Sequence, residues 1–525
     1  MYADVSFPIS SFQVFSYKVP ENLATAASVG STVNAPLGKR MVTGIIVRCY
    51  SESKYTGKIK EITSIEEGKP ILDGQLWKLI TWLSSYYDTP IGLAAKAVLP
   101  SKLSTSYEPK KQNFARVLHS QNEKNIKGST QIKVFNFLKS QNLAVPFSAL
   151  KIFSPNPSSI CNSLEKKGLI EIIQKPVIPN IYETSLESEP KEINLTSDQQ
   201  NAISAICNSL DQNIFDPFLL HGVTGSGKTE VFIDAAKHAM NQNKSVVVLL
   251  PEISTTPQIA GRFKSVFGDS VAVWHSKLSK SSRAWIWKKI CNGDFKIIVG
   301  ARSAIFTPLK NLGLIIVDEE QENAYKQTSS SPKYHAKEVA LMRGKISKAT
   351  VILSSATPSI ESYFNYKSDK FKYLELPKRF GNAKLPEVHL VNMIDENKAT
   401  ENYDTIFSQL LLDKIEDRIK KNEQVILLHN RRGFAPILRC DDCGEISKCP
   451  HCQLSLTFHK TDNVLKCHFC NFTKPPAGKC ANCSSFNGRL SGTGTQKIEH
   501  ELAKLFPDAV IDRLDLDAAP TAQKI

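Results

Sequence analysis

A ten-residue segment in the middle of the chain has the residue types and spacing of a phosphate-binding loop. HGVTGSGKTE at 221–230 follows the apolar run Phe218–Leu220 and precedes an amphipathic stretch. In this Walker A pattern, glycines let backbone N–H groups curl around phosphates, lysine reaches the terminal phosphates and threonine ligates Mg²⁺. The flanking strand and helix argue against a chance glycine-rich turn. The predicted nucleotide contacts are Gly222, Val223, Thr224, Gly225, Ser226, Gly227, Lys228 and Thr229.

Two carboxylates stand at the end of another apolar run. LGLIIVDEEQ at 312–321 places Asp318 and Glu319 where a buried strand would emerge. Phosphoryl transfer needs charge neutralisation and an aligned nucleophile. Asp318 is expected to hold Mg²⁺ through its water shell, and Glu319 to position and deprotonate the attacking water. A solvated acidic strand end is the alternative, but beside a Walker A motif the pair predicts ATP hydrolysis, with Lys228, Thr229, Asp318 and Glu319 as catalytic residues.

Eight of the twelve cysteines form four C-x-x-C pairs. Each pair offers two thiolates at one point, and two pairs complete a tetrahedral zinc site, so eight sulfurs predict two Zn²⁺ ions. Four thiolates leave no position for a catalytic water, so both ions are expected to be structural. Spacing alone does not say which pairs share an ion. The predicted ligands are Cys440, Cys443, Cys449, Cys452, Cys467, Cys470, Cys480 and Cys483.

Disulfides are the alternative for these cysteines, and a reducing cytosol disfavours them. His451 and His468 neighbour the pairs but are not needed as ligands. The four scattered cysteines are expected to be small core residues: Cys49, Cys161, Cys207 and Cys291.

Composition limits the class of protein. The 525 residues are too many for one core and predict three or four domains. With 41% hydrophobic and 22% charged residues, and no apolar run of membrane-spanning length, the chain predicts no membrane segment. Nothing at MYADVSFPIS directs secretion, so the cytoplasm is expected. A net charge of +15 favours nucleic acid as a partner, with a basic surface that only aids solubility as the alternative.

Two small modules are predicted before the phosphate-binding loop. Residues 1–105 alternate β-like runs and turns before a helical stretch, which indicates a β-rich domain; the runs are Phe12–Val19, Thr32–Ala35 and Gly44–Val47, and the helix is Gly74–Tyr87. Residues 106–180 fit a winged helix after an exposed polar connection at 106–130. Its predicted elements are helices at Ile132–Lys139, at Phe147–Phe153 and from Ser158 or Ser159, and a strand at Leu169–Ile173. This module could contact DNA or dock proteins.

Beyond Leu195, short apolar runs alternate with longer amphipathic stretches, as in a buried parallel sheet with helical crossovers. The predicted strands are Phe218–Leu220, Ser245–Leu250, Lys296–Val299, Leu314–Val317 and Val351–Leu353.

Several further segments, taken in order, carry a family resemblance. LLPEISTTPQ (249–258), VGARSAIFTP (299–308) and LSSATPSIES (353–362) resemble superfamily 2 helicase motifs. LTSDQQ resembles the adenine-reading element of that superfamily, with Gln199 at the matching position. YKQTSSSPKYHAKEVA (325–340), HNRRGFAPILRCDDCG (429–444) and SGTGTQKIEHELAKLFPDAVIDRLD (491–515) narrow the resemblance to the family of primosomal protein N′ (PriA), bacterial replication-restart helicases, over essentially the whole chain.

The resemblance implies a multidomain α/β fold: a β-rich 3′-end DNA-binding domain (1–105), a winged helix (106–180), a RecA-like ATP-binding helicase lobe (190–375) and a partial second lobe (376–525) that holds the zinc insert (440–483). It implies an ATP-dependent 3′-to-5′ DNA helicase that recognises stalled or branched forks and initiates primosome assembly. Nested zinc pairing, forked and single-stranded DNA with 3′ ends, primosome proteins and single-strand-binding protein as partners, and DNA sensing by the loop from Tyr325 to His335 also come from the resemblance.

The sequence departs from the family pattern at two positions, and two alternative functions remain open. Gln321 and Ser16 stand where the family usually has histidine and aspartate. The chain stops at Ile525, before the later motifs of the second lobe, so we expect weak unwinding from it alone. The alternative functions are a double-stranded DNA translocase of another superfamily 2 class and a non-enzymatic DNA-binding scaffold.

Overall fold

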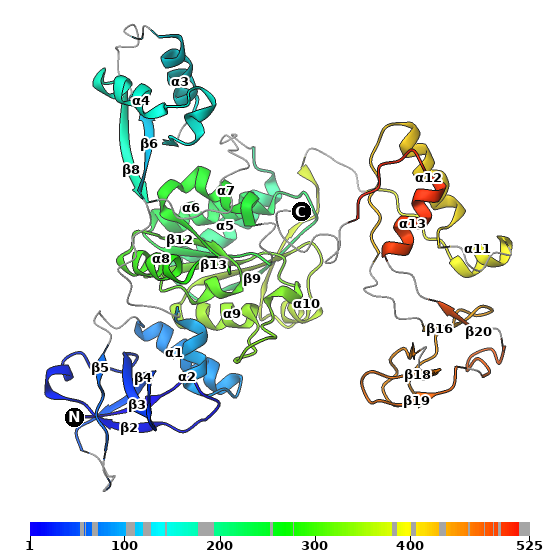
Figure 1. The fold of residues 1–525 in the computed structure, drawn as a ribbon, viewed down its shortest axis with the longest axis horizontal. Helices are drawn as coiled ribbons and strands as arrows, with labels where there is room; N and C mark the ends of the chain where they lie inside the picture. The colour runs from blue at the N-terminus through cyan, green and yellow to red at the C-terminus, as the bar shows by residue number, and fades with distance from the viewer. Residues whose placement is uncertain are drawn as a thin grey trace. The chain divides into compact units, whose positions relative to one another are not determined.

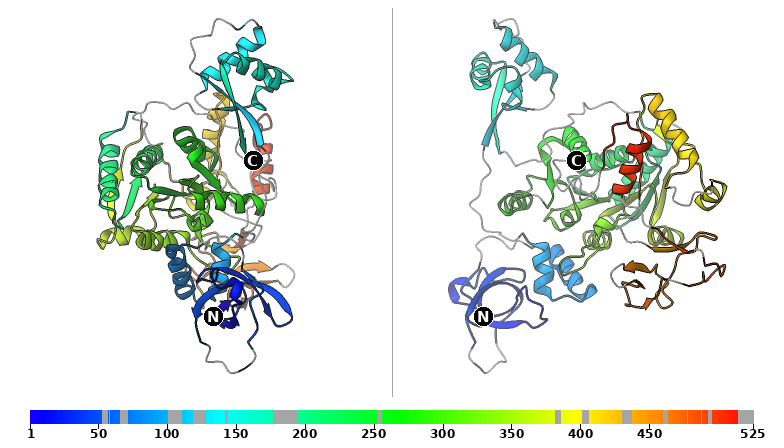
Figure 2. Two further views of the ribbon diagram at one scale, coloured as in Figure 1. Left: turned by 90° about the vertical axis from the view of Figure 1, so that its left-hand side faces the viewer. Right: turned by 45° about the vertical axis from the view of Figure 1, so that its right-hand side comes forward.

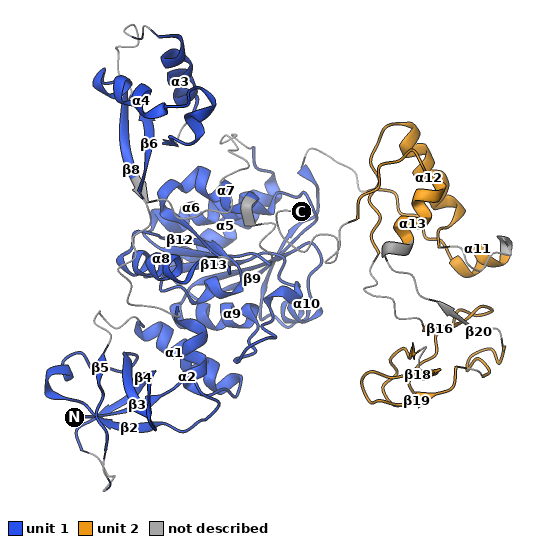
Figure 3. Cartoon of the chain, viewed as in Figure 1, with its two compact units in different colours: residues 1–384 blue, residues 385–525 orange. Residues whose placement is uncertain are grey.

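The computed structural model describes residues 1–52, 57, 59–65, 72–100, 111–118, 126, 128–141, 144–176, 194–251, 256–276, 278–380, 386–400, 406–429, 437–459, 463–476, 478–486, 488–491 and 495–513. The chain divides into two compact units, Met1–Lys384 and Leu385–Ile525 (Figure 3). None of the described helices combines the length and the apolar character needed to cross a bilayer.

Unit 1 begins with an antiparallel sheet in which side chains alternate between two faces. Its strands are β1 (Tyr2–Ser6), β2 (Phe15–Lys18), β3 (Thr32–Leu37), β4 (Arg40–Tyr50) and β5 (Ser64–Ile65), in the order β2-β1-β4-β3-β5. Ala3 and Val5 are fully buried, whereas Asp4 between them points to the opposite face. The 3-10 turn η1 (Glu21–Leu23) and helices α1 (Gly74–Tyr86) and α2 (Ile91–Val98) complete this part. The sequence pattern predicted β2, β3, β4 and α1 but missed β1 and α2.

The next part has the element order of a winged helix. It comprises β6 (Lys111–Val117), α3 (Ser129–Ser140), β7 (Val145–Pro146), η3 (Ala149–Ile152), α4 (Pro157–Lys166) and β8 (Ile170–Pro176), with sheet order β7-β6-β8. The assignment of 106–130 to an exposed connection was wrong for Lys111–Val117, which pairs antiparallel with β8 along its whole length. Its polar residues concealed it, since only Ala115 in it is fully buried.

The largest part of unit 1 is a seven-stranded sheet whose neighbouring strands are all parallel (Figure 1). The order is β11-β12-β10-β13-β14-β9-β15, and the bounds are β9 (Pro217–Gly222), β10 (Ser245–Leu249), β11 (Val271–Trp274), β12 (Ile297–Gly300), β13 (Leu312–Val317), β14 (Thr350–Ser355) and β15 (Lys372–Leu376). All five predicted strands are confirmed. The edge strands β11 and β15 were missed: β11 is apolar and buried but only four residues long, and β15 has a mixed pattern with only Leu376 buried.

Helices cover both faces of this sheet, so its strands other than the edge strand β15 are buried on both sides (Figures 1 and 2). One face packs on α5 (Ser197–Gln212), α6 (Lys228–Asn241) and α7 (Thr256–Phe267). The other packs on α8 (Lys280–Asn292) and α9 (Ala336–Ser347), and α1 joins that same apolar cluster. The remaining elements are α10 (Ile360–Lys367), η4 (Gly268–Ser270), η5 (Arg302–Phe306) and η6 (Asn323–Tyr325).

The sheet order brings three chemically important segments to one edge. Strands β13, β14 and β9 are neighbours and run parallel, so their carboxyl ends lie together. The phosphate-binding loop follows β9, Asp318 follows β13, and the Ser-Ala-Thr segment begins at the end of β14 with Ser355. Ligands of open parallel sheets bind at this edge.

Among the described residues of unit 2, buried apolar side chains form two small clusters. Its helices are α11 (Met393–Thr400), α12 (Gln409–Lys420) and α13 (Thr495–Leu505). Its sheet has the order β19-β18-β17-β16-β20, with β16 (Ile437–Cys440), β17 (Thr457–His459), β18 (Val464–Lys466), β19 (Thr473–Lys474) and β20 (Gly488–Ser491). Two cysteines, Cys449 and Cys467, belong to the apolar cluster of this sheet.

Candidate nucleotide and metal sites

The loop between β9 and α6 has the backbone that phosphate binding requires. Gly225 and Gly227 have φ angles of 79° and 80°, in the left-handed region that glycine adopts without strain. A Cβ on Gly227 would collide with the side-chain amide of Gln199. α6 starts at Lys228, so its unpaired N–H groups face the loop and Thr229 lies in its first turn. This arrangement of backbone N–H groups is suited to binding an anion such as phosphate.

The chain beyond the sheet also holds this loop. The backbone N–H of Val223 donates to Leu376 O at 3.2 Å, and that of Phe380 donates to Gly225 O at 2.9 Å. Leu376 is the last residue of β15. These two backbone hydrogen bonds, called the strap bonds below, connect the loop to residues 376–380, at and just beyond the end of β15.

Gln199 fixes the loop from the other side. It is 1% exposed at the start of α5, where Thr196 and Gln199 form a reciprocal capping box. Its Oε1 accepts from Thr196 N at 2.8 Å and its Nε2 donates to Ser226 O at 2.9 Å. Both polar ends of the side chain are therefore used inside the protein, and adenine contact by Gln199 stays a prediction.

Lys228 lies between the loop and the acidic motif. Its Nζ donates to Gly222 O at 3.0 Å and lies 3.6 Å from Oε1 of Glu319. Glu319 has a left-handed φ of 46°, which turns the chain sharply at the end of β13. Gln321 Nε2 donates to Glu319 Oε2 at 3.0 Å, so the residue that departs from the family pattern steadies this carboxylate.

Asp318 is the most deeply placed of the candidate catalytic residues, at 8% exposure. Burial raises the pKa of Asp318 to about 6, the Glu319 charge adds to the shift, and Lys228 opposes it. Within the described residues, its Oδ1 has no hydrogen-bond partner. A buried carboxylate oxygen without a donor, near enough to Lys228 for that charge to lower its pKa, suits a divalent cation bound with phosphate. The residues present therefore fit Mg²⁺.

The neighbouring motifs lie as follows. Arg302 of the VGARSAIFTP segment donates to Lys326 O at 3.0 Å. Tyr325 is fully buried, and its hydroxyl donates to Leu249 O at 3.0 Å. Tyr334 is 4% exposed and packs edge-on against Phe306, so in this structure neither tyrosine offers a face to a base. Within LLPEISTTPQ, residues 252–255 lie outside the described residues.

Each C-x-x-C pair folds into the same tight turn. The N–H of the residue four positions after the first cysteine donates to that cysteine's carbonyl oxygen, at 2.9 to 3.0 Å. That residue has a left-handed φ in all four turns, between 57° and 76°, and the four are Gly444, Gln453, Asn471 and Ser484. The repeated turn aims two thiols at one point, as zinc knuckles do.

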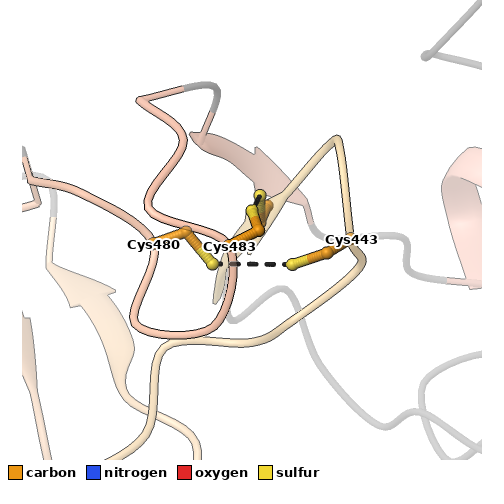
Figure 4. Close-up of side chains that lie close together, drawn as sticks. Cys443, Cys480 and Cys483 are labelled. Carbon is orange, nitrogen blue, oxygen red and sulfur yellow. Dashed lines mark hydrogen bonds between the residues drawn. The ribbon is translucent and has the colours of Figure 1, made fainter.

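The eight thiols gather in two groups of four. Within each group the sulfurs lie within 4.8 Å of one another; the groups are Cys440, Cys443, Cys480 and Cys483, and Cys449, Cys452, Cys467 and Cys470. Figure 4 shows Cys443 facing Cys480, whose sulfurs are 3.5 Å apart. Thiolates around Zn²⁺ at about 2.3 Å stand about 3.8 Å apart, whereas a disulfide needs about 2.05 Å. The distances fit zinc and exclude disulfides, and the grouping is the nested one.

A polar cluster occupies the outward face of the N-terminal sheet. Asp4 lies opposite Ser16 on β2 and Arg48 on β4. Ser16 Oγ donates to Asp4 Oδ1 at 2.7 Å, and Tyr50 Oη donates to the same oxygen at 3.0 Å. Tyr2 stacks on Tyr50 with ring centroids 5.9 Å apart. Although Ser16 replaces the expected aspartate, a carboxylate is thus present on the adjacent strand, which the sequence did not reveal.

Comparison with known proteins agrees with these sites. Three family models match the chain: the 3′ DNA-binding domain of PriA at residues 4–100, the DEAD/DEAH box helicase domain at 196–365 and the Cys-rich region of PriA DNA helicase at 449–475. The replication restart protein PriA of Bacillus subtilis is 33% identical, over 98% of this chain and 73% of its own length. The protein of the same name from Chlamydia pneumoniae is 37% identical, over 98% and 70%. The chain belongs to the PriA family.

Membership of the PriA family confirms the expected multidomain α/β fold and the expected class, an ATP-dependent DNA helicase of replication restart. The helicase domain implies use of a nucleotide and Mg²⁺, and the Cys-rich region with two four-thiol groups indicates zinc. The 3′ DNA-binding domain indicates binding to DNA at 3′ ends.

Proposed function

We propose that this PriA family member hydrolyses MgATP with Lys228, Thr229, Asp318 and Glu319 to unwind forked DNA in the 3′-to-5′ direction. The observation that carries the proposal is the meeting of Lys228 Nζ and Glu319 Oε1, at 3.6 Å, beside the glycine loop. In bound MgATP, Lys228 would contact the terminal phosphates, while Thr229 and Asp318 would hold the cation. Mg²⁺ would supply charge neutralisation on the phosphates.

Glu319 is the proposed base for the attacking water. Its carboxylate is half-exposed and steadied by Gln321, so it can accept a proton from water at the phosphate. Asp318 is less suited to this role, because it is 8% exposed whereas the side chain of Glu319 is 36% exposed.

Glu319→Gln tests this assignment. The amide keeps the shape but accepts no proton, so DNA-stimulated ATP turnover should fall about 10²- to 10⁴-fold while nucleotide affinity stays within about threefold. Steady-state turnover and titration with a fluorescent ATP analogue measure the two. Glu322→Gln is the matched control, because Glu322 is exposed three residues further along. Equal turnover in the two variants would refute the role of Glu319.

We further propose that both four-thiol groups hold structural Zn²⁺ with nested pairing. The grouping of sulfurs within 4.8 Å supports it. Each knuckle turn already fixes its two thiols, so the ions would cross-link segments that have little apolar core of their own.

The DNA proposal is that the outward face of the N-terminal sheet receives a 3′-terminal nucleotide. The two donors to Asp4 found among the described residues both end on Oδ1, so we propose that Oδ2 accepts a terminal 3′-hydroxyl. The stacked Tyr2 and Tyr50 offer a ring face for a base, and Arg48 adds positive charge beside Tyr50 at 5.8 Å. Other primosome proteins and single-strand-binding protein are the proposed protein partners, in the cytoplasm.

Two alternatives make different predictions. A double-stranded DNA translocase would move on duplex without displacing a strand, so a forked substrate with one labelled strand separates it from a helicase. A non-enzymatic scaffold would keep its cellular role after Lys228→Ala, whereas a motor would lose it.

A further inference from the structure

A buried polar cluster lies directly behind the hydrolytic carboxylates. Glu320 is fully buried, Lys337 is 7% exposed and Ser362 is 1% exposed. Lys337 Nζ lies 2.9 Å from Glu320 Oε2, in an ion pair closed off from solvent. No sequence motif pointed to this pair.

Both carboxylate oxygens of Glu320 accept hydrogen bonds from the side chains and backbone around them. Ser359 N donates to Oε1 at 2.7 Å, and Ser359 Oγ and Ser362 Oγ donate to Oε2 at 3.0 and 2.8 Å. Lys337 also donates to Ser359 Oγ at 3.0 Å. Burial alone would raise the pKa of Glu320, but the hydrogen bond and charge of Lys337 and the bonds from Ser359 and Ser362 lower it below its ordinary value. The carboxylate is therefore charged and fully bonded.

Stability alone gives a weak reason for such a cluster. A buried ion pair costs desolvation that well-packed apolar residues of similar volume avoid, so it adds little net stability. The cluster instead fixes geometry, because each hydrogen bond sets the orientation of the two groups that it joins. Removing one partner of the ion pair would leave a buried charge unpaired.

The cluster joins three segments with different tasks. Glu320 directly follows Asp318 and Glu319, and its N–H donates to Ser354 O at 3.0 Å. Ser359 and Ser362 begin α10, just beyond the Ser-Ala-Thr segment. Lys337 lies in the first turn of α9, immediately after the segment 326–335.

The segment before α9 is itself held by a basic motif residue. Arg302 donates to Lys326 O at 3.0 Å, and His335 Nδ1 accepts from Lys337 N at 3.3 Å at the start of α9. A displacement of Arg302 or of segment 326–335 would therefore move Lys337, and Lys337 is bonded to the residue next to Glu319.

We propose that Lys337 and Glu320 are positioning residues that transmit binding of single-stranded DNA to the hydrolytic carboxylates. Both side chains are buried, so they are not placed to contact nucleotide or DNA directly. The ion pair links the orientation of the backbone at Glu319 to the position of the first turn of α9. The inference rests on the proposed catalytic roles of Asp318 and Glu319 and on the contact of single-stranded DNA with the segment from Tyr325 to His335 that the family resemblance implies.

The test compares ATP turnover of the purified protein with and without single-stranded DNA. In Lys337→Met, DNA-independent turnover should stay within about threefold of wild type, and the stimulation by DNA should fall by about tenfold or more. DNA affinity, measured by fluorescence anisotropy, should not change. Lys345→Met, an exposed lysine of the same helix, is the control and should keep full stimulation.

Since Lys337→Met leaves Glu320 unpaired, the double variant Glu320→Gln/Lys337→Met removes both charges. It should melt near the wild-type temperature and still lack stimulation. A double variant with normal stimulation would overturn the proposal, and so would a loss of stimulation that a loss of DNA affinity accounts for. Absence of ATP turnover in the wild type would instead refute the proposed function.

Discussion

At the scale of single residues, Asp318 shows how strongly position alters a carboxyl group. Burial raises its pKa from 3.8 to about 6, with Glu319 adding to the rise. Between these two values the folded state binds more protons at this site than the unfolded state does. The free energy of unfolding therefore decreases as the pH rises from about 4 to about 6, and the loss is complete at neutral pH.

Asp318→Asn should relieve this loss. In nucleotide-free protein at pH 7.5, the amide should raise the melting temperature of the helicase lobe by the equivalent of about 2–3 kcal/mol, while abolishing ATP turnover. At pH 4 the gain should shrink toward zero, because the wild-type carboxyl is then protonated. Differential scanning calorimetry at both pH values measures this. A gain of equal size at both would show that the charge of Asp318 is not its source.

The site residues that the sequence predicted lie in short local motifs, whereas those that it missed make contacts between distant positions of the chain. Lys228 and Asp318 lie in local patterns, because a strand end and a helix start fix their neighbours within a few positions. Glu320 bonds to residues 17 to 42 positions away, Lys337, Ser359 and Ser362. Such a cluster has no periodicity or fixed spacing, so only the fold reveals it. Asp4 was missed for the same reason, since its partners come from neighbouring strands.

At the scale of elements, buried parallel strands were predicted well, because apolar residues on both faces give a continuous run. Lys111–Val117 was not, because a half-exposed strand with polar residues resembles a connection. The cysteine turns were predicted only in part. Spacing predicted the knuckles and the family resemblance implied nested pairing, but only the distances between the sulfurs in the fold showed which knuckles share a site.

Paired cysteine substitutions test the zinc arrangement. Cys443→Ser with Cys480→Ser should remove one zinc ion per chain, because both belong to one group. Cys443→Ser with Cys449→Ser should remove both ions, because it damages both groups. Sequential pairing predicts the reverse for these two variants. Metal content by atomic emission decides, and Cys207→Ser, which lies far along the chain from both groups, should lose none.

The sheet face around Asp4 gives a second prediction at this scale. Asp4→Asn should weaken binding of DNA with a free 3′-hydroxyl by about tenfold, since a bond to a charged acceptor contributes about 1.5 kcal/mol or more. Binding of the same DNA with a 3′-phosphate should change little. Fluorescence anisotropy with both substrates measures the difference. Glu21→Gln, at an exposed position of the same N-terminal part, controls for general loss of a negative charge. Parallel weakening for both substrates would contradict terminal recognition.

At the scale of the whole molecule, the predicted nucleotide contacts all lie in unit 1, and all eight predicted zinc ligands lie in unit 2. Residues 1–384 expressed alone should therefore bind a fluorescent ATP analogue with an affinity within about threefold of the whole chain. A zinc chelator should leave this binding intact in both proteins. Failure of the folded fragment to bind, with circular dichroism showing native helix content, would place essential contacts outside unit 1.

The two strap bonds at the glycine loop have a mechanical consequence. Gly225 and Val223 are bonded to Phe380 and Leu376, on the stretch of chain that runs out of the sheet toward unit 2. Tension on that stretch would act first on the bond between Phe380 and Gly225, and then on the bond between Leu376 and Val223 at the end of β15. The backbone of the phosphate-binding loop is thus coupled to the position of the chain where it leaves the sheet.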